Sequence, residues 1–263
     1  MSVIAQAGAK GRQLHKFGGS SLADAKCYLR VAGIMKEYSQ AGDMMVVSAA
    51  GSTTNQLISW LKLSQSDRLA AHQVQQSLRR YHTELIGGLL EPAAADTLIA
   101  AFIHDLERLA GLLDGGVSEA VYAEVVGHGE VWSARLMAAV LNQLGMEAAW
   151  LDARAFLRAE RAAQPQVDEG LSYPLLQQLM AQHPNKRLVV TGFISRNQAG
   201  ETVLLGRNGS DYSATQIGAL AGASRVTIWS DVAGVYSADP RKVKDACLLP
   251  LLRLDQAREL ERL

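Results

Sequence analysis

The sequence predicts an α/β fold in which helices cover both faces of a central sheet. Three short runs rich in β-branched residues indicate buried strands, at residues 44–48, 188–194 and 225–230. Continuous apolar runs of this kind are typical of a parallel sheet that is covered on both faces. Between about residues 55 and 144, leucines and alanines recur at helical spacing. This order of strands and helices favours the α/β class. A TIM barrel is the competing fold, but the helical middle interrupts the regular βα units that it needs.

The remaining elements follow from local signals. Residues 13–17 can form a short strand, and Ser21 begins an S-x-x-D pattern that indicates a helix start. A helix is expected over residues 130–145, with Gly145 as its C-cap. Another is expected from Ser210, whose side chain would cap it. The best loop candidates are residues 162–170 and 182–187.

Composition excludes several classes of protein. The chain has 263 residues, with 26 basic and 26 acidic side chains, so its formal net charge is zero. That balance argues against a nucleic-acid binder, which usually carries a basic excess. Two cysteines are too few for a disulfide framework, and no apolar run reaches membrane-spanning length. We expect a cytoplasmic protein with no membrane or nucleic-acid partner, a flexible arm over residues 1–11 and one folded region over residues 12–263.

The stretch KFGGSS, residues 16–21, combines a cation, two glycines and a helix start. A strand, a glycine turn and a helix together direct backbone N–H groups and a positive dipole end at one spot. Gly18 and Gly19 would let an anion approach the backbone, and Lys16 would add a positive charge. The alternative is an ordinary glycine turn with a surface lysine.

Two later clusters also combine glycines with charged side chains. In LGRNGSDY, residues 205–212, Arg207 could grip a carboxylate at two points, although a hairpin turn followed by a capped helix explains the same letters. SDVAGVYSADPR, residues 230–241, follows a predicted strand directly, at the edge where open α/β sheets bind ligands. Its polar side chains would lie near a nucleotide there, unless Asp239-Pro240 simply makes a turn.

Single polar residues give weaker signals, and several known motifs are missing. Ser48 and Thr54 lie in a small-residue loop after a strand, and Glu130 lies at a helix start, where the helix dipole favours an acid for structural reasons. The sequence has no GxxxxGK[ST], no GxGxxG, no HExxH and no CxxC. A P-loop, a dinucleotide fingerprint and a zinc site by spacing are therefore excluded.

KFGGSS, GHGE, LLGRNGSDYSA and SDVAGVYSADPR, in this order, resemble the motifs of aspartate kinases of the amino-acid kinase family. The resemblance covers nearly the whole chain and extends to the aspartokinase half of bacterial bifunctional aspartokinase/homoserine dehydrogenases. It implies a three-layer α/β/α sandwich with a mostly parallel central sheet. It also implies ATP-dependent phosphorylation of the side-chain carboxylate of L-aspartate, the first step toward lysine, threonine and methionine.

The resemblance implies a role for each matching residue. The expected catalytic residues are Lys16 and Asp211, the acid that orients this lysine. The expected phosphate and ATP contacts are Lys16, Phe17, Gly18, Gly19, Ser230, Asp231, Tyr236 and Arg241. The expected aspartate contacts are Ser48, Thr54, Glu130, Arg207 and Ser210. Mg²⁺ would be held by the ATP phosphates, with no direct protein ligand. Ser20, Asn208, Ser230 and Ala233 depart from the commonest family pattern, and Asn208 stands where a glycine is usual.

The resemblance leaves three functions open. The first is aspartate kinase, the second is a glutamate 5-kinase-like carboxylate kinase, and the third is an inactive nucleotide- or amino-acid-binding module. Family members continue beyond a helix like the last one here, LRLDQARELERL, into regulatory modules and, in bifunctional members, an NADP-dependent dehydrogenase. The chain is therefore expected to be a truncated catalytic domain, whose activity alone is open. A homodimer is compatible with the family, but no residue pattern is evidence for it.

Overall fold

A computed structural model describes residues 11–230, 232–238 and 242–253. Its internal contacts separate two units, one up to Trp229 and one from Ser230 onward. The expected arm over residues 1–11 lies outside the described residues except for Gly11. The predicted division at residue 12 therefore stays a prediction.

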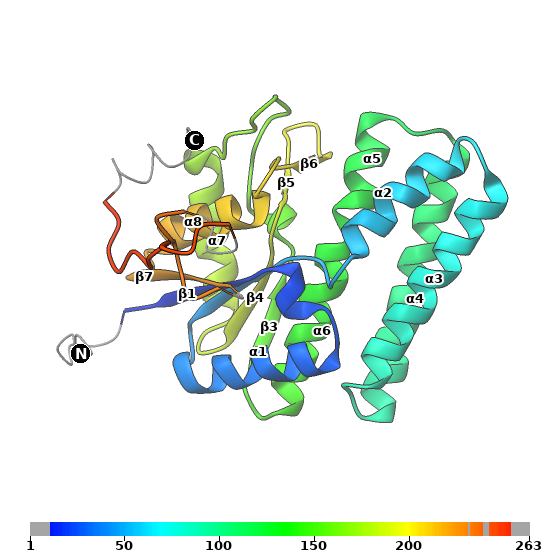
Figure 1. Ribbon diagram of the computed structural model, residues 1–263. Helices are drawn as coiled ribbons and strands as arrows, with labels where there is room; N and C mark the ends of the chain where they lie inside the picture. Colours follow the sequence, from blue (N-terminus) through cyan, green and yellow to red (C-terminus); the bar gives the residue numbers. More distant parts are fainter. Residues whose placement is uncertain (1–10, 231, 239–241, 254–263) are drawn as a thin grey trace. The chain divides into compact units, whose positions relative to one another are not determined.

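The first unit is built on a parallel sheet of five strands (Figure 1). In the order β3-β4-β2-β1-β7, the strands are Ala148–Leu151, Arg187–Thr191, Met44–Val47, Gln13–Phe17 and Arg225–Trp229. A short antiparallel hairpin of β5 (Ile194–Arg196) and β6 (Thr202–Leu204) follows β4. The open sheet confirms the predicted α/β class and rules out the TIM barrel.

Helices cover both faces of the sheet, which gives three layers. Along β2, Met45 and Val47 belong to one core with α1 (Ala25–Tyr38) and α6 (His128–Gln143). Met44 and Val46 belong to a second core with α7 (Glu169–Gln182) and α8 (Gly209–Leu220). Successive strand residues point to opposite faces, so one apolar run contributes side chains to both cores. The layers are visible in Figure 1, with α7 and α8 above the sheet and α1 and α6 below it.

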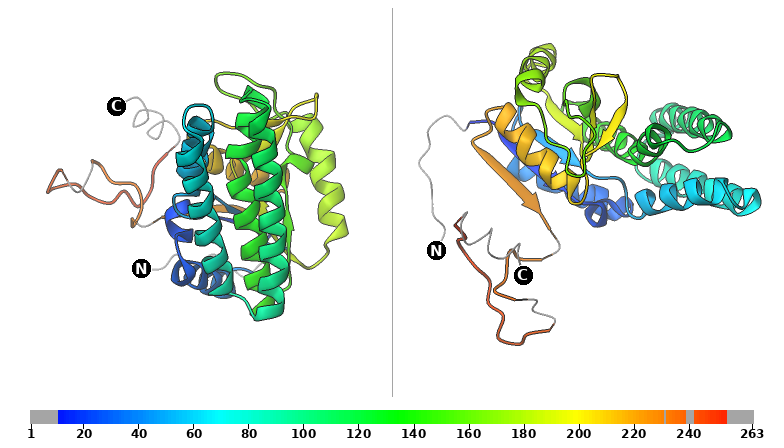
Figure 2. Two further views of the ribbon diagram at one scale, coloured as in Figure 1. Left: turned by 90° about the vertical axis from the view of Figure 1, so that its right-hand side faces the viewer. Right: turned by 90° about the horizontal axis from the view of Figure 1, so that it is seen from above.

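The helical middle forms a bundle beside the sheet. It consists of α2 (Thr53–Ser64), α3 (Arg68–Gly87), α4 (Pro92–Asp114) and α5 (Glu119–Val126). Figure 2 shows α3 and α4 as long neighbouring helices on the side away from the sheet. Two 3₁₀ turns, η1 (Gly19–Leu22) and η2 (Ala153–Ala155), follow β1 and β3.

Two strand predictions were partly wrong. The run at 188–194 is not one strand, because β4 ends at Thr191 and the chain turns at Gly192 and Phe193 before β5. Phe193 has φ +67°, which no extended strand contains. The strand at 225–230 is not buried on both faces. Among the described strands β7 pairs only with β1, and Ile228 on it is 48% exposed.

Two cap predictions were also wrong. Ser21 lies inside the 3₁₀ turn, and α1 begins later, with Asp24 as the N-cap that accepts from the Cys27 N–H. Ser210 does not cap α8, because the N-cap is Asn208 and the helix begins at Gly209. Asn208 has φ +55°, in the left-handed region that the usual glycine adopts freely and asparagine tolerates best among other residues.

The second unit is described over residues 230, 232–238 and 242–253. It contains little regular structure. Tyr236 and Leu248 form an isolated antiparallel bridge, which the hydrogen bonds from Ser237 N to Cys247 O and from Leu249 N to Val235 O extend.

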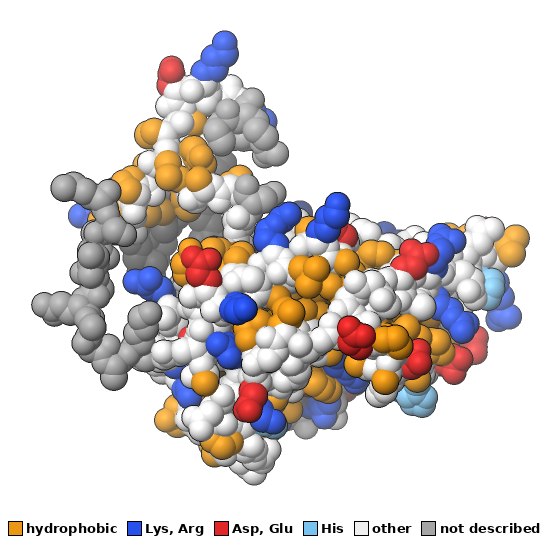
Figure 3. All heavy atoms as spheres, turned by 90° about the horizontal axis from the view of Figure 1, so that it is seen from below, with side chains coloured by type: hydrophobic (Ala, Val, Ile, Leu, Met, Phe, Trp, Pro, Cys, Tyr) orange, Lys and Arg blue, Asp and Glu red, His pale blue; other side chains and the backbone are white. Residues whose placement is uncertain are grey.

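The charge pattern of the surface agrees with the zero net charge. On the face shown in Figure 3, lysine and arginine side chains alternate with aspartate and glutamate side chains, with hydrophobic side chains between them. None of the helices in the described residues combines the length and the apolar character needed to cross a bilayer.

Candidate active site

A cavity of about 310 Å³ lies at the carboxyl edge of the sheet. It collects residues that follow β1, β2 and β4, together with the first turns of α6 and α8. Its lining consists of Lys16, Gly18, Gly19, Ser48, Ala49, Gly51, Thr54, Glu130, Phe193, Gly206, Asn208, Gly209, Ser210 and Asp211. Ligands bind at this edge in open α/β sheets, and the positive dipole ends of two helices point toward it.

Lys16 and Asp211 form an ion pair in this cavity. Lys16 lies near the end of β1, and its Nζ is 2.5 Å from Oδ1 of Asp211 in the first turn of α8. The lysine side chain is only 10% exposed, whereas the aspartate side chain is 38% exposed. Asp211 therefore fixes the direction of the ammonium group. The lysine charge is partly balanced by Asp211, which is the more exposed partner, and the ammonium group remains one of the lining groups of the cavity.

Two loops that touch each other form the floor of the cavity. We call residues 18–24 the first loop and residues 48–53 the second loop. Gly51 N donates to Gly19 O at 3.1 Å, and a Cβ on Gly19 would lie 2.9 Å from the carbonyl oxygen of Ala49. Only glycine fits at position 19, because that contact is shorter than carbon and oxygen allow. Gly19 of KFGGSS therefore lets the two loops pack backbone against backbone.

Glu130 contributes a buried carboxyl group at the start of α6. The residue is 3% exposed, its Oε1 accepts from the Ala49 N–H at 3.2 Å, and its Oε2 has no partner among the described groups. Burial raises the pKa of Glu130 to about 8, although the Ala49 N–H partly opposes this shift. An unpaired carboxyl oxygen in a cavity wall can accept a hydrogen bond from a cationic ligand group.

The structure gathers most of the predicted substrate residues but not all of them. Ser48, Thr54 and Ser210 line the cavity. Arg207 is exposed and does not belong to the lining, although its neighbours Gly206 and Asn208 do. A role in binding a carboxylate would need this side chain to turn inward, so its role stays a prediction.

The predicted nucleotide residues are divided among several places. Gly18 and Gly19 line the cavity, whereas the Phe17 ring is fully buried and stacks on Trp229 at 5.9 Å between ring centroids. The Phe17 side chain therefore belongs to the core, and at most its backbone can contact a ligand. Ser230 and Tyr236 lie in the second unit, and Asp231 and Arg241 lie outside the described residues.

Sequence reasoning did not assign six of the lining residues to the site, which are Ala49, Gly51, Phe193, Gly206, Asn208 and Gly209. Phe193 is the most informative of these. Its left-handed backbone is uncommon for a bulky residue, and the Ser213 hydroxyl accepts from its N–H at 3.0 Å. The glycine before it, directly after a buried strand, was the available signal for a turn at this edge.

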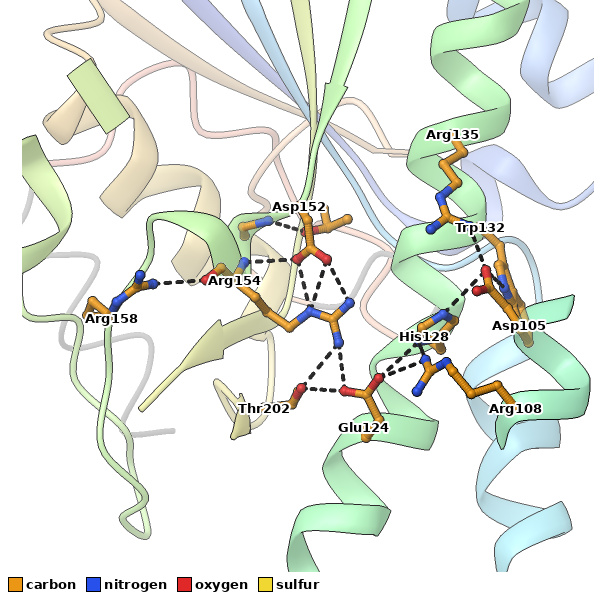
Figure 4. A network of polar contacts seen from close by, with 12 residues as sticks. Asp105, Arg108, Glu124, His128, Trp132, Arg135, Asp152, Arg154, Arg158 and Thr202 are labelled. Carbon is orange, nitrogen blue, oxygen red and sulfur yellow. Dashed lines mark hydrogen bonds and ion pairs between the residues drawn. The ribbon is translucent and has the colours of Figure 1, made fainter. Parts of the chain in front are cut away.

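A second polar cluster lies at the junction of α4, α5, α6, η2 and β6 (Figure 4). Arg154 donates to both carboxylate oxygens of Asp152, and its Nη1 lies 2.7 Å from Oε2 of Glu124. Glu124 also pairs with Arg108, and Asp105 pairs with Arg135 at 2.5 Å. His128, which the sequence placed in the GHGE motif, lies between Glu124 and Asp105. We call this set the arginine network.

The pairing changes the ionisation of the two acids that flank His128. Burial works against the charged form of Asp105, but His128 and Arg135 outweigh it and lower the pKa of Asp105 to about 2. Burial likewise opposes ionisation of Glu124, but Arg154, Thr202 and Arg108 lower its pKa to about 2. Both groups are therefore charged at neutral pH.

The cavity fits a metal ion only when a ligand brings most of its coordination sphere. The described residues contain no group of three His, Cys, Asp or Glu side chains arranged to hold a metal. The two carboxyl groups of the lining are Asp211, which is paired with Lys16, and Glu130, which is paired with a backbone N–H. Mg²⁺ commonly binds through phosphate oxygens, water and one or two carboxylates, and this donor set is compatible with that arrangement.

Residues 11–262 match the model of the amino acid kinase family, so the chain belongs to that family. It is 86% identical over all its 263 residues to bifunctional aspartokinase/homoserine dehydrogenase 2 of Escherichia coli strain K12. It is 31% identical over 248 residues, or 93% of its length, to lysine-sensitive aspartokinase 3 of the same strain. The chain spans 32% of the first relative and 54% of the second.

Solved structures agree with this assignment. The chain is similar to E. coli aspartokinase III in complex with aspartate and ADP, with a TM-score of 0.80 and 29% identity. That match covers 89% of this chain and 52% of the other. The three-layer sandwich predicted from the sequence is thus confirmed.

Proposed function

We propose that this chain transfers the γ-phosphoryl group of ATP to the side-chain carboxylate of L-aspartate, which yields ADP and 4-phospho-L-aspartate. The observation that carries the proposal is that one cavity collects Lys16, the Gly18–Gly19 turn, Thr54, Glu130 and Ser210 from four separate stretches of sequence. These are residues that family resemblance assigns to phosphate and aspartate. Aspartate kinases at 86% and 31% identity support the same reaction.

The main physical difficulty of this reaction is repulsion between two anions. Two unit charges about 4 Å apart repel by roughly 4 kcal/mol at an effective dielectric near 20. Phosphoryl transfer needs little covalent help from a protein, so positioning and charge stabilisation dominate. Lys16, directed by Asp211, would stabilise the transferring phosphoryl group, and the Gly18–Gly19 backbone would hold its oxygens. Mg²⁺ bound to the ATP phosphates would neutralise further charge.

Glu130 and Arg207 would orient the acceptor. Glu130 has a buried oxygen without a partner among the described residues, which suits the α-ammonium group of an amino acid. Arg207 would reach the α-carboxylate from the rim of the cavity. The side-chain carboxylate of aspartate is already ionised at neutral pH. The transfer therefore requires no general base, and none is assigned.

What the natural protein contains beyond this chain is also a proposal. The relative that is 86% identical to this chain is bifunctional, and the chain spans 32% of it. We propose that the natural protein continues into a homoserine dehydrogenase that uses NADP. A homodimer and a cytoplasmic location stay predictions.

A hydroxamate assay tests the reaction. The chain is incubated with ATP, Mg²⁺, hydroxylamine and either aspartate or glutamate, and acyl phosphate is trapped as the coloured hydroxamate. Product from aspartate alone is expected. Product from glutamate would favour a glutamate 5-kinase-like enzyme. Ligand binding without product from either acid would favour an inactive binding module.

A further inference from the structure

Two neighbouring side chains of α3, Tyr81 and His82, reach the two loops that form the cavity floor. We infer that both are positioning residues of the candidate active site, with His82 fixing the second loop and Tyr81 fixing the first. The inference rests on the proposed function, because that function assigns these loops to phosphate and aspartate. Successive residues on a helix point about 100° apart, so two adjacent residues of one helix can contact two different loops.

His82 holds the second loop through Thr53. Thr53 Oγ1 lies 2.6 Å from the carbonyl oxygen of Ala50 and 3.1 Å from Nε2 of His82. A carbonyl oxygen only accepts, so the threonine hydroxyl donates to Ala50 and accepts from His82. Burial lowers the pKa of His82 to about 3, so the imidazole is neutral at every pH at which the enzyme would work. Its Nε2–H is therefore a permanent donor to the loop.

Tyr81 holds the first loop and touches the second. Its hydroxyl donates to the carbonyl oxygen of Ala23 at 3.0 Å. A Cβ on Gly51 would lie 3.0 Å from the same hydroxyl oxygen. Burial raises the pKa of Tyr81 to about 12, so the hydroxyl keeps its proton at neutral pH. Gly51, which also has φ +53°, is the point at which this side chain and both loops meet.

The second loop contributes Ser48, Ala49 and Gly51 to the lining of the cavity. Ala49 N donates to Glu130, and Thr54, the residue after Thr53, lines the cavity. A shift of the Ala50–Thr53 turn would therefore change the direction of the Ala49 N–H and the position of Thr54 together. The loop thus links α3 in the helical bundle to the aspartate side of the cavity.

Packing alone does not require a histidine at position 82. Its ring contacts Phe102 and Trp132 at 4.9 and 5.0 Å between centroids, in a cluster that a phenylalanine would also fill. A buried imidazole costs free energy unless it is hydrogen-bonded. The hydrogen bond to Thr53 is thus the specific contribution of this residue.

The first experiment compares His82→Phe with Phe102→Leu. His82→Phe keeps an aromatic ring and removes the donor, whereas Phe102→Leu loosens the same cluster without touching either loop. We expect His82→Phe to raise the aspartate KM and lower kcat/KM by about tenfold, the value of roughly one hydrogen bond. The ATP KM should stay within about twofold of the parent chain. His82→Gln, which places an amide donor near Nε2, should restore most of the loss.

The second measurement does not depend on activity. Hydrogen–deuterium exchange of the peptide over residues 48–54 should speed up in His82→Phe but not in Phe102→Leu. The peptide over residues 19–24 should speed up in Tyr81→Phe. If His82→Phe does not fold, Thr53→Val removes the acceptor, with Thr53→Ser as its control.

The outcomes separate the two proposals. Equal exchange of residues 48–54 in the parent chain and in His82→Phe would overturn the inference, and so would equal effects of His82→Phe and Phe102→Leu on aspartate KM. Absence of aspartyl phosphate in the parent chain would instead overturn the proposed function. In that case the exchange measurement would still decide whether α3 holds the loops.

Discussion

The cavity and the arginine network of Figure 4 both contain buried charged groups, but they differ in pairing. In the network each carboxylate lies within 2.9 Å of an arginine nitrogen, and Arg154 serves two of them. In the cavity, Glu130 keeps one oxygen that no described residue pairs with. Buried polar groups are nearly always paired in folded proteins, so an exception calls for an explanation. Among the described residues, Nε2 of His128 in the network also lacks a hydrogen-bond partner. The difference therefore concerns the carboxylates, which arginines hold in the network, whereas Oε2 of Glu130 is unpaired among the described residues.

The same difference appears in the pKa values of the acids. Arginines and His128 lower the pKa of Asp105 and of Glu124 to about 2, whereas burial without a cation raises the pKa of Glu130 to about 8. A ligand with a cationic group would lower the pKa of Glu130 again. Substitutions in each region test whether this difference in pairing has the expected effects on stability and turnover.

The largest expected effect is on stability, at the centre of the network. Arg154→Met removes a guanidinium that is only 8% exposed and leaves Asp152 and Glu124, each 22% exposed, without their shared partner. Removing one member of a buried pair typically costs about 3–5 kcal/mol. We expect a loss of that size in the free energy of unfolding, measured by urea titration. Arg79→Met, at an exposed position of α3, is the control and should change it by less than about 0.5 kcal/mol. A loss for Arg154→Met as small as that of the control would mean that the network does not hold the fold.

The next effect is on turnover, at the cavity. Lys16→Ala removes the ammonium group that we propose stabilises the transferring phosphoryl group, and kcat should fall by about 10²–10³. The free energy of unfolding should change far less, because Asp211 remains 38% exposed and can be solvated. Lys62→Ala, an exposed lysine on α2, is the matched control for the hydroxamate assay. Turnover like that of the parent chain would remove Lys16 from the mechanism.

The two regions should also respond to pH in opposite directions. The folded pKa of Glu130 lies above its ordinary value of about 4.5, so its contribution to stability falls as pH rises from about 4.5 through 8. The folded pKa values of Asp105 and Glu124 lie below their ordinary values. Their contributions to stability are therefore present above about pH 4.5 and are lost as pH falls toward 2.

Glu130→Gln isolates the first of these trends. Without ligand, this variant should be more stable than the parent chain at pH 9, by on the order of 5 kcal/mol, and within about 1 kcal/mol of it at pH 5. Urea unfolding at both pH values measures the difference. The difference in free energy of unfolding between the two proteins could instead be the same at pH 5 and pH 9. That result would show that folding does not raise the pKa of Glu130.

The smallest effect is expected at the rim of the cavity. Arg207 is exposed, so Arg207→Lys should leave stability unchanged. Lysine cannot make the forked contact with a carboxylate, so the aspartate KM should rise several-fold while the ATP KM stays constant. Steady-state kinetics with each substrate varied in turn measures both constants. An unchanged aspartate KM would remove Arg207 from the aspartate site.

The sequence predicted the fold and much of the candidate site for a physical reason. Buried parallel strands such as 44–48 need continuous apolar runs, and glycine turns after them mark the edge where ligands bind. The Lys16, Gly18–Gly19, Thr54 and Glu130 positions, all identified from sequence, line one cavity.

What the sequence could not predict depends on long-range contacts. The ion pair of Lys16 joins residues 195 positions apart, and only the family resemblance implied it, because nothing local to either residue indicates it. His82 lies in a stretch with ordinary helical spacing, and only the fold brings it to Thr53. The turn at Phe193 was missed because its apolar neighbours match the strand pattern on both sides.

The most direct test of the unpaired oxygen of Glu130 is the proton balance of aspartate binding. Calorimetric titration of aspartate at pH 7, with Mg²⁺ and a non-hydrolysable ATP analogue present, is repeated in buffers with different ionisation enthalpies. We predict that the parent chain releases about one proton per aspartate bound, because the ligand ammonium group would ionise a carboxyl group whose pKa is about 8 without ligand. Aspartate binding with no proton exchange would contradict the proposed role of Glu130.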